Sequence, residues 1–97
     1  MESKQLDGRL IYNPTLKMVS DAILQLDEGM WIKVVVGHEL HYFHTSNWMG
    51  SIDVTIRRGK DKKPKRERFG PGQAAGAVSL LRSYWNANQL KGDPNAS

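Results

Sequence analysis

The hydrophobic pattern of this chain changes its period at Gly29, and that change constrains the fold more than any other feature. Before Gly29, apolar residues recur every three or four positions, at Leu16, Val19, Ile23 and Leu26. This spacing places them on one side of an α-helix. After Gly29 the chain becomes rich in β-branched and aromatic residues, which favour strands. The sequence therefore predicts a domain that combines helix and sheet.

Two helices are expected, over residues 14–28 and 71–90. Asn13 fits an N-cap of the first helix and Pro14 its first residue, where a missing N–H costs nothing. Gly29 is suited to end this helix in the left-handed conformation. The second helix begins with small residues that allow close packing on a sheet. Its apolar positions are Ala74, Ala77, Val78, Leu81, Tyr84 and Trp85.

Three strands are expected over residues 31–36, 40–45 and 51–58, with turns near 37–39 and between Ser46 and Ser51. The third strand shows clean alternation, because Ile52, Val54 and Ile56 point one way and the residues between them point the other. Residues 9–12 and 66–69 are candidates for two further short strands.

These elements predict one small α+β domain covering residues 1–97, with loose termini at 1–8 and 92–97. A chain of 97 residues has room for a single core. The expected order is (β)-α-β-β-β-(β)-α. It indicates an antiparallel sheet of three to five strands with both helices packed on one face. Trp31 and Trp85 are assigned to the core. The other core residues are Leu16, Val19, Ile23, Leu26, Val34, Ile52, Val54, Ile56, Val78 and Leu81.

Over residues 14–90 the order of elements resembles that of double-stranded-RNA-binding domains. There too, a basic segment lies close to an alanine-rich last helix, here Gln73 to Ala77. That family carries a lysine cluster where the last helix starts, and this chain has Gly70, Pro71, Gly72 and Gln73 instead. The resemblance is therefore one of topology and implies no membership.

Composition excludes several classes of protein. The chain has no cysteine, which removes disulfides, thiolate metal sites and cysteine nucleophiles. No apolar run approaches the ~18 residues of a membrane span, and the N-terminus lacks the apolar region of a signal peptide. We therefore expect a cytoplasmic protein without membrane contact.

The sequence favours a binding module over an enzyme. His38, His41 and His44 recur every third residue beside Glu39. Their spacing matches no zinc motif, and on a strand His41 would oppose the other two histidines. No nucleophile with a recognisable partner accompanies them. We accordingly expect no catalytic residue, no metal and no cofactor.

Positive charge is concentrated in the basic segment, residues 57–68. This segment holds eight basic and two acidic residues, a net charge of +6, whereas the rest of the chain sums to −2. Such a cluster attracts polyanions, which a diffuse surplus would not do. Its cations are Arg57, Arg58, Lys60, Lys62, Lys63, Lys65, Arg66 and Arg68.

Trp48 lies between two expected strands, beside Met49, where a large apolar side chain is hard to bury. Aromatic residues and methionine are enriched at interfaces. The expected function is therefore nucleic-acid binding, to DNA or RNA, through the basic segment with Trp48 as a further contact. The alternative is a protein-binding inhibitor or adaptor, of the kind that phages and mobile elements encode. It would dock its basic segment on an acidic protein surface and use Trp48 and Met49 as an apolar anchor.

Overall fold

A computed structural model of the chain describes residues 7–59 and 63–91. These residues form five strands and two helices, in the expected order, so the prediction of a small α+β domain is confirmed. The elements are β1 (Asp7–Tyr12), α1 (Leu16–Leu24), β2 (Met30–Val36), β3 (His41–Trp48), β4 (Ser51–Arg58), β5 (Lys65–Phe69) and α2 (Ala74–Ala87).

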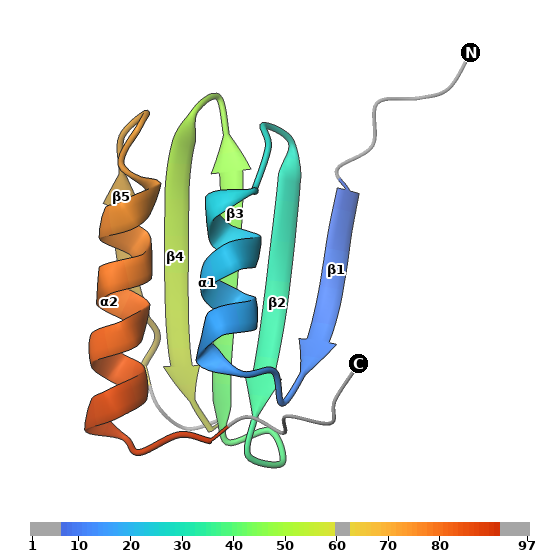
Figure 1. Cartoon of the computed structure of the whole chain (residues 1–97), viewed down its shortest axis with the longest axis vertical. Coiled ribbons are helices and arrows are strands. Elements are labelled where there is room, and N and C mark those ends of the chain that lie inside the picture. The colour runs from blue at the N-terminus through green and yellow to red at the C-terminus, as the bar shows by residue number, and fades with distance from the viewer. Residues whose placement is uncertain (1–6, 60–62, 92–97) are drawn as a thin grey trace.

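The sheet is mixed, which corrects the prediction of a purely antiparallel sheet. Its spatial order follows the chain, from β1 at one edge to β5 at the other (Figure 1). The pairs from β2 to β5 are antiparallel, as their short connections require. β1 instead runs parallel to β2. The reason is α1, which carries the chain back along the sheet between these two strands and so makes a β-α-β unit.

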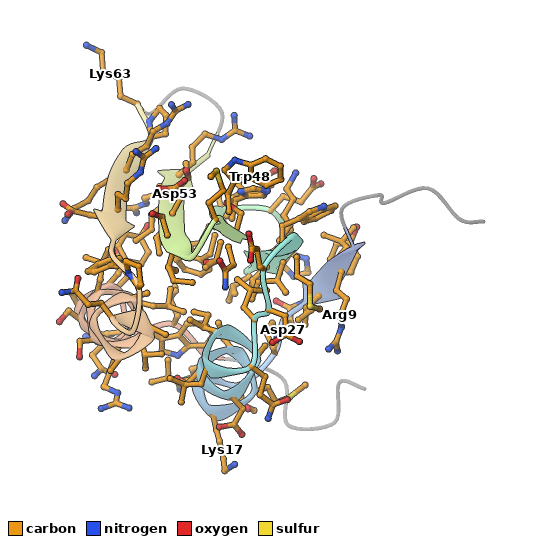
Figure 2. The ribbon with its side chains drawn as sticks, turned by 90° about the horizontal axis from the view of Figure 1, so that it is seen from above. Arg9, Lys17, Asp27, Trp48, Asp53 and Lys63 are labelled. Atoms are coloured by element: carbon orange, nitrogen blue, oxygen red, sulfur yellow. The ribbon has the colours of Figure 1, made fainter. Side chains whose placement is uncertain are left out.

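Both helices lie on the same side of the sheet, and they contact each other (Figures 1 and 2). α2 approaches β5 closely at Gly76, where an added Cβ would lie 2.9 Å from the Phe69 ring. A side chain at this position would push the helix off the strand. The small residues at the start of α2 thus set how tightly it packs.

The first helix is shorter than the sequence suggested. Its N-cap is Thr15, whose hydroxyl accepts a hydrogen bond from the Met18 N–H at 3.2 Å. Asn13 instead adopts a positive φ, and its side-chain oxygen accepts from the Gly37 N–H at 2.9 Å. Gly29 does have a positive φ, but the helix ends at Leu24, and Gly29 belongs to the turn that leads into β2.

The turn between β3 and β4 is also tighter than expected. Met49 and Gly50 alone connect the strands, both with positive φ, as in the two-residue hairpin turns that match strand twist. Ser46 and Asn47, expected in this turn, belong to β3.

The core lies between the sheet and the two helices. All ten core residues predicted from the sequence belong to it, Leu16 being only partly buried. Trp85 is buried as expected, but Trp31 lies on the opposite side of the sheet and is no core residue. Within residues 7–59 and 63–91, no helix has both the length and the apolar character needed to cross a membrane.

Candidate nucleic-acid interface

The side of the sheet away from the helices, which we call the open face, carries polar, charged and aromatic residues. On β3 and β4, alternation directs His41, Phe43, Val54 and Ile56 towards the helices and their neighbours outwards. No described helix covers the open face (Figure 2). Its residues are Gly8, Leu10, Tyr12, Trp31, Lys33, Val35, Tyr42, His44, Ser46, Trp48, Asp53, Thr55, Arg57, Arg66 and Arg68.

Strand register aligns these residues in rows across the sheet. One row runs through Lys33, His44, Thr55 and Arg66. A second runs through Trp31, Ser46, Asp53 and Arg68, and a third through Tyr12, Val35, Tyr42 and Arg57. In every row, the residues of β4 and β5 include an arginine, and those of β2 and β3 include an aromatic ring. We call β2 and β3 the aromatic side of the open face, and β4 and β5 its cationic side. Lys33 on the aromatic side and Asp53 on the cationic side are the exceptions.

Trp31 and His44 form a stacked pair on the aromatic side. Their ring centroids are 5.5 Å apart, and the ring planes differ by 25°. Gly8 of the neighbouring strand makes room for the indole, because an added Cβ there would overlap the Trp31 ring. The indole thus contacts a residue of each neighbouring strand, Gly8 of β1 and His44 of β3, and we call the Trp31–His44 pair the aromatic platform.

The environment of His44 favours its neutral form. Burial of the ring lowers its pKa, and the positive charge of Lys33 lowers it further. Above the ordinary histidine pKa of about 6.5, the ring is uncharged. The platform is consequently aromatic rather than cationic near neutral pH.

Tyr42 lies between two cations. The Lys33 ammonium is 5.4 Å from the centroid of its ring, and the Arg57 guanidinium carbon is 4.8 Å from it. Both distances fall within the range of cation–π attraction. These contacts hold the two positive charges above the sheet surface, next to the aromatic platform.

The arginines of the cationic side differ in their partners. Arg68 donates a hydrogen bond from Nε to the Asp53 carboxylate at 2.7 Å, so part of its charge is balanced. Arg57 and Arg66 make no ion pair within the described part of the chain. Among the arginines of this face, these two are therefore the best placed to contact phosphate.

Three hollows of about 300 to 390 Å³ adjoin on the open face, and His44 lines all of them. One extends towards Trp31 and Trp48, and another towards Arg66 and Arg68. The third includes Tyr42 and Arg57. The surface around His44 is thus uneven enough to receive planar groups.

The fold divides the basic segment between the two sides of the sheet. Arg57, Arg66 and Arg68 belong to the open face. Arg58 and Lys65 alternate to the helix side, and with Lys63 they line a separate hollow beside Tyr84 and Asn88. Lys60 and Lys62 lie outside the described residues. The segment expected to act as one site therefore presents its cations in two directions.

Trp48 and Met49 are exposed, by 57% and 74%, at the turn that joins β3 to β4. Trp48 lines the same hollow as Trp31 and His44. Figure 2 shows it on the side of the sheet opposite Lys17 of α1. Trp48 thus extends the aromatic side of the open face to the end of the strands.

The three histidines do not converge. His38 lies in the turn after β2, and His44 is on the open face. His41 points to the helix side, where its Nδ1 is 2.8 Å from the Tyr84 hydroxyl oxygen. Burial lowers the His41 pKa, and nearby Arg58 lowers it further, whereas burial raises the pKa of Tyr84. Among the described residues, no group of three or more His, Cys, Asp or Glu could hold a metal ion.

Sequence reasoning missed Trp31, Lys33, Tyr42 and His44 as members of one surface. The signal was present in β3, where Tyr42, His44, Ser46 and Trp48 occupy alternate positions. In β2 it was hidden, because Val34, Val35 and Val36 are consecutive and give no alternation.

Comparison of this chain with protein-family models, curated proteins and solved structures gave no match.

Proposed function

We propose that this protein is a non-enzymatic module that binds nucleic acid through the open face of its sheet. The observation that carries the proposal is the placement of the Trp31–His44 platform beside Arg57 and Arg66, on a face that no helix of the described residues covers. Aromatic rings stack on bases, and arginines neutralise phosphates with release of counterions. An open face that combines both suits a ligand with planar bases and a charged backbone.

Only part of the basic segment is assigned to direct contact with the ligand. The whole basic segment contributes positive potential, which helps to attract a polyanion. Direct contact is assigned to Arg57, Arg66 and Arg68 of that segment, together with Lys33 and Trp48. Arg58, Lys63 and Lys65 face the other side and supply only the longer-range attraction.

Two double variants test the assignment, because they remove the same charge from the same two strands. Arg57→Ala/Arg66→Ala removes two cations from the open face. Arg58→Ala/Lys65→Ala removes two cations from the helix side and is the matched control. Binding of a labelled oligonucleotide of mixed sequence is measured by fluorescence anisotropy over a series of salt concentrations.

The open-face variant should bind at least about tenfold more weakly, and the slope of log K against log salt should fall by about 1.4, or 0.7 per lost phosphate contact. The control should lose much less affinity. Equal losses in both variants would contradict a site on the open face. No retention of DNA or RNA by the parent protein at low salt would contradict the function itself.

A second candidate function rests on the exposed pair Trp48 and Met49. An exposed apolar anchor of this kind suits an inhibitor or adaptor that docks on a partner protein, with the basic segment making separate contacts to an acidic surface. This alternative requires weak nucleic-acid binding by the parent and a protein partner that is lost with Trp48→Ala. In the nucleic-acid proposal, Trp48→Ala weakens oligonucleotide binding directly.

A further inference from the structure

We propose that the ligand of the open face is single-stranded nucleic acid, bound with its bases on β2 and β3 and its phosphates on β4 and β5. This inference rests on the function proposed above and adds the class of nucleic acid and its orientation. It follows from how aromatic rings and arginines are distributed over the sheet.

The aromatic and cationic sides of the open face lie next to each other along the strands. Trp31 and Tyr42 stand on β2 and β3, whereas Arg57 and Arg66 stand on β4 and β5. Neighbouring strands are about 4.8 Å apart, so the two sides are separated by only a few ångströms. A single strand lying over their boundary directs bases to one side and phosphates to the other.

A duplex cannot use this arrangement. Its bases are stacked on each other, so the faces that would stack on Trp31 or Tyr42 are hidden. Reading a duplex through its major groove requires a helix or a β-ribbon that enters the groove. Here α1 and α2 lie on the far side of a five-stranded sheet (Figure 2). A duplex would therefore meet the arginines and leave the aromatic rings without partners.

The aromatic platform is suited to stacking because the Trp31 ring is held in place and the His44 ring is uncharged. The Trp31 indole lies against Gly8 and is stacked on His44, so its position is fixed before a base arrives. Burial, and then the charge of Lys33, keeps the His44 pKa low and its ring neutral near pH 7. A fixed ring loses little conformational freedom on binding, which favours affinity.

The test compares a labelled single strand of about 12 nucleotides, a length within the usual range of single-strand sites, with a duplex of the same sequence. Both DNA and RNA are used. The parent should bind the single strand at least tenfold more tightly. Trp31→Ala/Tyr42→Ala should weaken single-strand binding by at least about tenfold and leave duplex binding unchanged. The slope with salt should change little, because no charge is removed. Lys33 and Arg57 lose their contacts with the Tyr42 ring in this variant, and Tyr42→Phe keeps them.

Trp31→Phe/Tyr42→Phe is the matched control, because it keeps an aromatic ring at both positions. It should retain most of the affinity. Thermal unfolding shows whether each variant is folded. If the double alanine variant does not fold, Tyr42→Ala alone decides, since this ring is only half-buried and makes no core contact. Equal binding of duplex and single strand by the parent, or full affinity in a folded alanine variant, would overturn this inference while the proposed function still stood. Failure of the parent to bind either form would overturn both.

Discussion

Gly8 is the residue that permits the aromatic platform, because any side chain at this position would occupy the space of the Trp31 indole. Glycine has no side chain that could itself contact a ligand. Its importance comes from the register of β1 and β2, which places Gly8 directly beside Trp31. A residue of this kind is recognised only once the strands have been paired.

Gly8→Ala should therefore displace the indole and weaken single-strand binding severalfold, with a change in tryptophan fluorescence. Gly70→Ala is the control, since its added Cβ would lie 3.7 Å from Gln73, an ordinary contact. Affinity is measured with the same labelled single strand. Unchanged affinity and fluorescence in Gly8→Ala would show that Trp31 is not held as described.

The lowered pKa values of His41 and His44 should make the stability of the protein depend on pH. Burial lowers both pKa values, with Arg58 and Lys33 adding to the effect. The unfolded chain then binds more protons below its histidine pKa of about 6.5, so stability should fall as the pH drops from 7.5 to 5. His41→Gln/His44→Gln should reduce this loss.

Thermal unfolding at a series of pH values measures the effect. His38→Asn removes a histidine from the exposed turn after β2, and asparagine tolerates the positive φ there. It is the control for loss of a histidine as such. A melting temperature that depends on pH equally in the parent and in the double variant would be at odds with the lowered pKa values.

At the scale of the element, β4 separates the two faces most clearly. Val54 is buried against the helices, whereas Thr55 is half-buried on the open face. Val54→Asp should destabilise the protein by roughly 3 kcal/mol or more, because it buries a charge with no partner. Thr55→Asp should change stability little but weaken oligonucleotide binding by repelling phosphate. A folded Val54→Asp variant with the parent's melting temperature would refute the register of β4.

Elements with regular patterns were predictable from the sequence, and those shaped by tertiary contacts were not. The alternation of β4 gave its bounds and its faces, and the helical spacing gave the apolar side of α1. The start of α1 was misplaced because Asn13 uses its side chain to bind the Gly37 N–H across the sheet. That partner is 24 residues away, and local sequence carries no sign of it.

At the scale of the molecule, the sequence showed that positive charge is concentrated but not in which directions it points. Arg57 and Arg58 are neighbours in the chain and lie on opposite sides of the sheet. Residues as distant as Trp31 and Arg66 share the open face because three strand pairings bring them together. Composition and residue spacing therefore do not reveal a candidate site whose residues are brought together by strand register.

The three tryptophans report directly on whether nucleic acid binds to the open face. Trp31 lies on the open face, Trp48 at its end, and Trp85 in the core. Their indole N–H signals are followed by nuclear magnetic resonance while a single-stranded oligonucleotide is added, and tryptophan-to-phenylalanine variants assign each signal. If nucleic acid binds on the open face, the Trp31 and Trp48 signals should shift with saturation and the Trp85 signal should stay in place. Binding that leaves the Trp31 signal unmoved would contradict a site on this face.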